Sequence, residues 1–116
     1  MPKFTRALLT TAAAGAALFT VASPAHADNY VQNCVDLAGG RLCVSYNYTS
    51  RTAAANAQRS GSTVSVDLAL QKGGSTLVSG HKTLSNGQWY GIYKSGVSYA
   101  NYCAYSAYIG GRVCLQ

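Results

Sequence analysis

The four cysteines of this chain constrain its fold more than any other feature, because they fall into two close pairs. Each pair encloses a diglycine, which suits a reversal of the chain. Four cysteines allow three pairings, and pairing within each close pair is the favoured one. Zinc is the rival interpretation, but the sequence has no Cys-x-x-Cys pair and His81 lies far from every cysteine along the chain. The predicted disulfides are Cys34–Cys43 around Gly39-Gly40 and Cys103–Cys114 around Gly110-Gly111.

The first disulfide is consistent with the register of a hairpin. A reversal over Leu37–Gly40 sets Cys34 opposite Cys43 and also sets Asp36 opposite Arg41, so both pairs share one face. The second pair needs a different turn. A two-residue turn at the second diglycine would not place its cysteines opposite each other, so that loop is expected to be longer or bulged.

The first 27 residues have the composition of an export signal. Lys3 and Arg6 precede an apolar run from Ala7 to Val21, and Ala25-His26-Ala27 is a small-x-small cleavage site. The apolar run is too short for a membrane-spanning helix. We therefore expect a secreted protein, cleaved near Ala27, whose residues 28–116 form one disulfide-bonded β domain. Without the two basic residues of the signal, the net charge falls from +6 to +4.

The alternation of apolar and polar residues along the chain predicts β-strands. Ser62–Lys72 is the clearest case, since Val64, Val66, Leu68 and Leu70 share one face. The expected fold is all-β, a small antiparallel β-sandwich or barrel of six to seven strands. Arg51–Arg59 shows no alternation and is interpreted as a short helix or a crossover loop, of which the loop is favoured. Asn86-Gly87 predicts a hairpin. The other expected strands are Arg41–Thr49, Thr76–Leu84, Gln88–Lys94, Val97–Ile109 and Arg112–Leu115.

The sequence offers little for catalysis. Asp36 already has a partner in Arg41, and Asp67 is expected to face solvent from a regular strand, so two facing acids are not expected. His81 has no evident orienting acid, and the phosphate-cradling and helical metal motifs are missing. We therefore expect no enzyme, no cofactor and no metal site.

The nine tyrosines set this chain apart from other small secreted domains. Four of them recur at every third residue of the expected strand Val97–Ile109, and a second aromatic cluster lies in 88–93. If these two runs pair, one sheet carries a dense aromatic surface. About half of the tyrosines are expected in or near the core, and the rest would form an exposed patch. The candidate binding residues are Trp89, Tyr90, Tyr93, Tyr99, Tyr102, Tyr105, Tyr108 and Arg112.

The chain resembles small exported two-disulfide β-proteins of Streptomyces-like actinobacteria. The resemblance lies in the signal, in the Gly/Ser/Tyr-rich strands and in the closing Tyr102-Cys103…Val113-Cys114-Leu115. It implies analogies to the adaptor subunits of umbrella toxin particles and to tendamistat-type amylase inhibitors. Trp89 is followed directly by Tyr90, so the Trp-Arg-Tyr turn of those inhibitors is not present, and no functional residue is carried over.

These observations predict a module that binds rather than reacts. The first hypothesis is a secreted protein-binding module, an inhibitor or an adaptor, whose partner is another secreted protein. The alternative is a module that binds carbohydrate or cell wall by stacking sugars on exposed aromatic rings. A small cationic antimicrobial protein is less favoured, since the charge is modest and no basic amphipathic helix is present. The scattered basic residues indicate no nucleic-acid partner, and no stable membrane insertion is expected.

Overall fold

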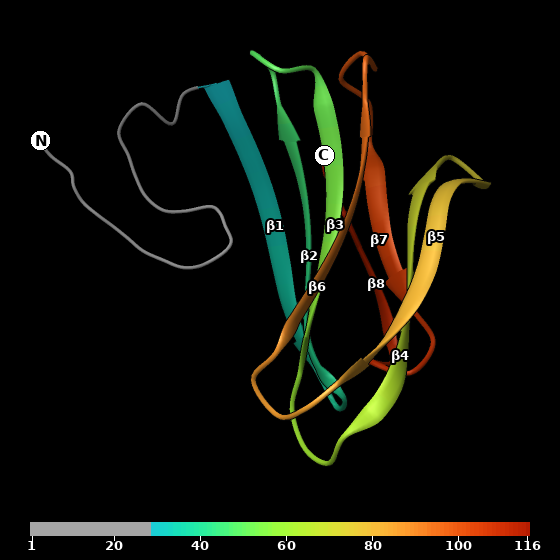
Figure 1. The fold of residues 1–116 in the computed structure, drawn as a ribbon. Coiled ribbons are helices and arrows are strands. Elements are labelled where there is room, and N and C mark those ends of the chain that lie inside the picture. Colours follow the sequence, from blue (N-terminus) through green and yellow to red (C-terminus); the bar gives the residue numbers. More distant parts are fainter. Residues whose placement is uncertain (1–28) are drawn as a thin grey trace, which may run out of the picture. The chain divides into compact units, whose positions relative to one another are not determined.

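The computed structural model describes residues 29–116, and this part of the chain is all-β, as the alternation predicts. It has eight strands, against the six to seven expected. They form two four-stranded sheets, ordered β1-β2-β3-β6 and β5-β4-β7-β8 (Figure 1). The predicted signal peptide and its cleavage site lie outside the described residues. The strands are β1 (Tyr30–Leu37), β2 (Gly40–Asn47), β3 (Thr52–Arg59), β4 (Val64–Lys72), β5 (Ser75–Leu84), β6 (Trp89–Ser95), β7 (Tyr102–Ser106) and β8 (Gly111–Cys114).

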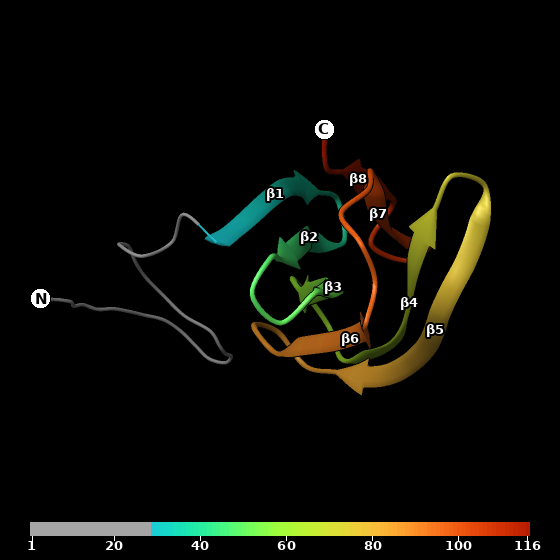
Figure 2. The same ribbon diagram turned by 90° about the horizontal axis from the view of Figure 1, so that it is seen from above.

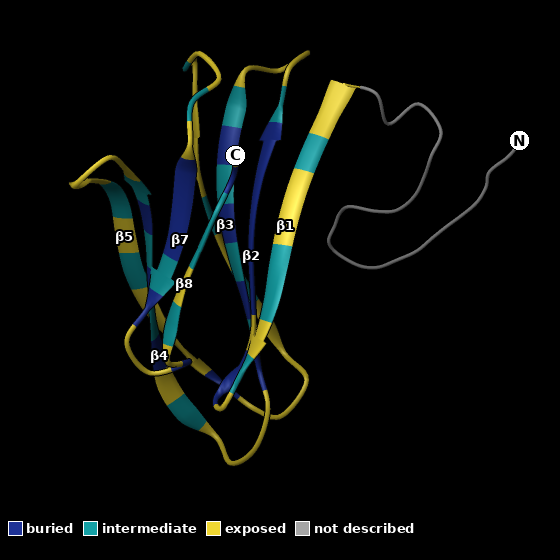
Figure 3. Cartoon of the chain, turned by 180° about the vertical axis from the view of Figure 1, so that it is seen from behind, coloured by how far each residue is buried: buried dark blue, intermediate teal, exposed yellow. Residues whose placement is uncertain are grey.

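One hydrophobic core joins the two sheets, which form separate layers when seen end-on (Figure 2). Alternate residues of each central strand point into it, so buried positions follow β2, β3, β4 and β7 (Figure 3). This is the packing of a small antiparallel sandwich, and it confirms the predicted fold class. The core residues are Leu42, Val44, Tyr46, Ala53, Ala55, Ala57, Val66, Leu68, Leu70, Leu84, Tyr102, Ala104, Ile109 and Leu115.

The segment interpreted as a loop is a central strand, and that prediction is wrong. β3 pairs with β2 on one side and with β6 on the other. It buries Ala53, Ala55 and Ala57 completely, while Ala54 and Asn56 face outward. Buried and outward residues alternate along β3, but alanine occurs at both kinds of position. The hydropathy of the sequence therefore does not show the alternation.

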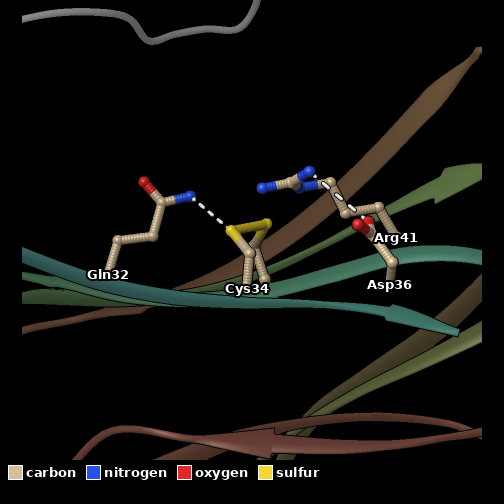
Figure 4. A network of polar contacts seen from close by, with 5 residues as sticks. Gln32, Cys34, Asp36 and Arg41 are labelled. Carbon is tan, nitrogen blue, oxygen red and sulfur yellow. Dashed lines mark hydrogen bonds and ion pairs between the residues drawn. A yellow bond between two sulfur atoms is a disulfide. The ribbon is translucent and has the colours of Figure 1, made fainter.

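Both predicted disulfides are present, Cys34–Cys43 and Cys103–Cys114. They join directly opposed residues of neighbouring strands, with Cα–Cα distances of 4.1 and 4.0 Å. The Arg41 guanidinium lies 3.4 Å from the Asp36 carboxylate, on the same side of the β1–β2 hairpin as the first disulfide (Figure 4). In the β7–β8 hairpin, residues 107–110 form the turn, so the expected longer loop is also confirmed.

Two predicted strand connections are wrong. The Asn86-Gly87 turn does not close a hairpin, since it carries the chain from β5 in one sheet to β6 in the other. The long strand Val97–Ile109 is limited to β7, which pairs with β4 and β8. β6 pairs with β3 instead, so the two aromatic runs lie in different sheets.

The turns of the two disulfide hairpins meet at one end of the sandwich. The backbone N–H of Gly39 donates to the Ile109 carbonyl (3.0 Å), and a Cβ at Gly39 would lie 2.8 Å from the Ile109 Cα. The Arg59 guanidinium is buried beside this contact and donates to the Gly39 carbonyl (2.9 Å). The first diglycine therefore allows backbone to pack on backbone.

Candidate functional site

The structure distributes the eight predicted binding residues over several places rather than one patch. Trp89 and Tyr93 lie exposed on β6, and Tyr90 is half-buried between them in sequence. Tyr102 is in the core, where its ring is fully buried. Tyr99 lies in the segment before β7, Tyr105 and Arg112 pair across β7 and β8, and Tyr108 lies in the turn 107–110. Five of the nine tyrosines are exposed, so the expected division between core and surface is confirmed.

The most exposed aromatic pair lies on the outer side of the β1-β2-β3-β6 sheet. Trp89 and Tyr93 face outward because their partners on β3, Gln58 and Ala54, alternate with the buried alanines. Trp89 is 44% exposed and Tyr93 is 66% exposed. The two residues are four positions apart along an extended strand, a distance of about 13 Å. β6 is also the edge of its sheet, so both rings are accessible from the side.

A single amide lies between these two rings. Gly91, midway between them on β6, pairs with Asn56 on β3, and the Asn56 side chain lies where a Cβ of Gly91 would be. The absence of a side chain at Gly91 thus lets Asn56 cover the strand. We call the surface formed by Trp89, Asn56 and Tyr93 the aromatic face. Asn56 could not be found from the sequence, since its segment looked like a loop.

A second aromatic group extends from the core to solvent, and we call its four residues the tyrosine cluster: Tyr46, Tyr48, Tyr99 and Tyr102. The Tyr46 ring stacks on Tyr102 (5.9 Å between centroids, 10° between planes) and meets Tyr48 edge-on (5.0 Å, 84°). Tyr48 and Tyr99 stack on each other (5.4 Å, 22°) and are both exposed. Burial raises the pKa of Tyr102, and Tyr46 adds to this rise while Arg51 opposes it.

Hydroxyl groups fix three rings of the tyrosine cluster. Tyr46 donates to the Val97 carbonyl (2.7 Å), Tyr102 donates to Ser98 O, and Tyr99 donates to Gln116 O. Tyr48 was missed because the expected strand Arg41–Thr49 included it as a regular strand residue. β2 in fact ends at Asn47, and no local pattern indicates that Tyr48 meets a tyrosine so distant in sequence.

The remaining predicted residues make contacts with neighbouring strands and turns of the fold. The Arg112 guanidinium lies over the Tyr105 ring (5.4 Å), and the Arg59 guanidinium lies against the Tyr108 ring (5.1 Å). Such cation–π contacts hold side chains in place at modest gain. Tyr90 turns inward, and its hydroxyl occupies the position where a Cβ of Gly80 on β5 would be.

Asp67 does not face open solvent from a regular strand, contrary to expectation. Its carboxylate accepts hydrogen bonds from the backbone N–H groups of Ala107 (2.8 Å) and Tyr108 (2.9 Å), and from the Ser106 hydroxyl (3.2 Å). Burial alone would raise its pKa, but these hydrogen bonds outweigh burial and lower it. His81 is its register partner on β5. Ser106, however, is fully buried and donates to the carboxylate, so these residues form a turn cap and not a nucleophile with its base.

This chain matches no protein-family model, no curated protein sequence and no solved structure. Its two disulfides indicate an oxidising compartment. Residues 29–116 contain no helix that is long and apolar enough to span a membrane.

Proposed function

We propose that this chain is a secreted, non-enzymatic binding module whose aromatic face recognises another secreted protein. The observation that carries the proposal is the exposure of Trp89 and Tyr93 on one side of a strand whose backbone is fixed by β3. Tryptophan and tyrosine are enriched among the residues that dominate protein interfaces. The disulfide-linked sandwich holds them in place before binding, which lowers the entropy lost on association.

Secretion is part of the same proposal. The N-terminal sequence has the three regions of a signal peptide, and the two disulfides need an oxidising compartment. If the captured partner is an enzyme that loses activity, the module is an inhibitor. If the partner is a structural subunit, the module is an adaptor in an exported assembly.

Affinity capture from the native culture medium tests this proposal. The wild-type protein is expected to retain one secreted protein at a stoichiometric ratio, and Trp89→Ala or Tyr93→Ala should abolish its retention. Tyr105→Ala is the matched control, because it removes an aromatic ring from the other sheet and should retain the partner. A free monomer in the medium, or a partner that both aromatic-face variants retain, would contradict the proposal.

Carbohydrate binding at the same face is the second candidate, and the position of Asn56 favours it. Two exposed rings with an amide between them resemble the combination that stacks and orients sugar rings. A buried Trp89 would have argued against this candidate, and Trp89 is exposed. Pelleting with purified cell-wall polysaccharide distinguishes the two. If the aromatic face binds sugar, the wild-type protein should pellet with the polysaccharide in the absence of any other protein, and Asn56→Ala should not. If the wild-type protein does not pellet, carbohydrate binding is rejected.

A further inference from the structure

A second candidate surface lies at one end of the sandwich, away from the turns of the two disulfide hairpins. The β2–β3 turn, the β4–β5 turn and the segment before β7 gather at this end (Figure 1). We call it the loop end. The tyrosine cluster opens to solvent here through the stacked rings of Tyr48 (44% exposed) and Tyr99 (38% exposed). These rings are anchored from below by Tyr46, so they form a rigid aromatic platform.

Arg51 adds a cation to this platform at a strained backbone position. Of the described non-glycine residues it alone has a positive φ, 53°. Glycine would adopt this conformation without steric cost, so the position keeps a side chain against local preference. The guanidinium donates to the Ser98 hydroxyl (3.2 Å), next to Tyr99, and no carboxylate in residues 29–116 pairs with it. Unexplained strain beneath an exposed cation suggests a functional role for that cation.

The acidic side chains of the described residues are unevenly distributed along the sandwich, whereas basic side chains occur at both ends. Lys72 ends β4 opposite Tyr102, and Lys94 near the end of β6 lies opposite Ala53, itself the partner of Tyr46. Both lysines are therefore at the loop end with Arg51. The two described aspartates are at the other end, Asp36 beside the β1–β2 turn and Asp67 against the β7–β8 turn. Three cations thus surround the tyrosines with no acidic side chain among them.

An open groove of about 730 Å³ adjoins this platform. Lys72 lies at the groove, and the apolar lining comes from Leu77, Ala100, Leu115 and the Cys103–Cys114 disulfide. Asn101, two residues after Tyr99, supplies an amide. An apolar side chain of a bound peptide fits such a lining, and an acidic residue next to it in the peptide would lie close to Lys72.

From this arrangement we propose that the loop end is a second binding surface, and that it takes an acidic peptide segment of a partner protein. Carboxylates of the segment pair with Arg51, Lys72 and Lys94, while an apolar side chain enters the groove. Tyr48 supplies planar contact area, and its hydroxyl makes no hydrogen bond within the described part of the chain. The proposal does not depend on the aromatic face: Lys94 follows Tyr93 in β6, but Tyr93 pairs with the outward Ala54 and Lys94 with the buried Ala53, so their side chains leave the strand on opposite sides.

A peptide fits the loop end better than a phosphate polymer does. The three cations are dispersed around aromatic rings and an apolar groove, whereas a phosphate track needs closely spaced basic residues. Tyrosine and arginine together are the pair that protein interfaces favour. A phosphate polymer would bind by charge alone and would be indifferent to the rings.

The test uses fluorescence anisotropy with a labelled peptide in which glutamates flank a single leucine. Wild-type protein is expected to bind it, and the same peptide with glutamine for glutamate is expected not to bind. Arg51→Gly should weaken binding by about tenfold without loss of stability, because glycine tolerates the positive φ. Tyr48→Ala should weaken binding to a similar extent. Lys82→Gln is the matched control, since it removes an exposed cation near the other end of β5 and should change affinity by less than about twofold.

Three outcomes would overturn the proposal. The first is no binding by wild type. The second is an equal loss in Arg51→Gly and Lys82→Gln, which would indicate attraction by net charge alone. The third is binding of inorganic polyphosphate as tight as that of the peptide, which would indicate a polyanion surface. The double variant Trp89→Ala/Tyr93→Ala should bind the peptide normally, so failure here is separable from failure of the aromatic face.

Discussion

Arg59 is a buried cation that has no acidic partner among the described residues. Its side chain is only 8% exposed, and its Nε donates to the Ser62 carbonyl (2.8 Å) while Nη1 donates to the Gly39 carbonyl (2.9 Å). The Tyr108 ring lies against the plane of the Arg59 guanidinium. Burial of a charge is tolerated here because carbonyl dipoles and a ring replace the lost water.

The planar fork of Arg59 should be irreplaceable by lysine. Arg59→Lys keeps the charge but cannot reach both carbonyls, so we expect a loss of about 1–3 kcal/mol in the free energy of unfolding. Urea unfolding measures this loss. Arg41→Lys is the control, because Arg41 makes an exposed ion pair at 3.4 Å and should cost less than about 0.5 kcal/mol. If Arg59→Lys and Arg41→Lys lower the free energy of unfolding equally, the hydrogen bonds of Arg59 to the two carbonyls do not stabilise the fold as described.

Asp67 should make the stability depend on pH in one direction. Its hydrogen bonds lower its pKa in the folded protein, so the ionised carboxylate favours folding. That contribution is complete above the unfolded pKa of about 3.9 and is lost as pH falls through the lower folded pKa. Asp67→Asn should therefore be less stable than wild type at neutral pH, by roughly 1 kcal/mol. The difference should shrink in acid.

Thermal unfolding of wild type and Asp67→Asn between neutral pH and about pH 2 measures this difference. Asp36→Asn controls for the loss of one negative charge, since Asp36 belongs to the exposed ion pair. A gap between wild type and Asp67→Asn that stays constant over the whole range would contradict the role given to Asp67.

At the scale of elements, the two disulfide hairpins depend on each other through their turns. Gly39 has no positive φ, so its lack of a side chain matters for the close approach of the Tyr108–Ile109 backbone. Backbone atoms cannot swing aside as side chains do. The contact therefore couples the first sheet to the β7–β8 hairpin of the second.

Gly39→Ala should destabilise the protein by about 1–3 kcal/mol, since its Cβ would lie 2.8 Å from both the Ile109 Cα and the Tyr108 carbonyl oxygen. Gly74→Ala is the matched control, because that site is open within 4 Å. Chemical denaturation compares the two variants. If Gly39→Ala is as stable as Gly74→Ala, the turns do not pack as described.

Sequence reasoning succeeded for elements whose signal is local. The alternation of β4 and the two short disulfide loops each depend on residues close together in the chain. It failed for β3, whose alanines serve both faces, and for the Asn86-Gly87 turn. Turn chemistry fixes the local reversal, but the sheet that the next strand joins is decided by long-range packing.

In the molecule as a whole, some tyrosines fill the core and others form exposed surfaces. Tyr46 and Tyr102 fill the core that a chain poor in phenylalanine must build from other residues, while Tyr48, Tyr93 and Tyr99 remain exposed. The sequence predicted this division but not its location. Pairing partners distant in the chain bring Asn56 beside Gly91 and Tyr48 beside Tyr99. Four of the exposed rings therefore form two separate surfaces, and Tyr30 and Tyr108 lie elsewhere, instead of all joining the single patch expected.

The state of Trp89 in the complex tests the central claim, because it is the only tryptophan of the chain and lies in the aromatic face. Acrylamide should quench its fluorescence readily in the free protein, since the side chain is 44% exposed. On addition of the secreted partner captured by wild type, the emission should shift to the blue and quenching should fall severalfold. A partner that binds while Trp89 stays equally quenchable would contradict recognition through this face.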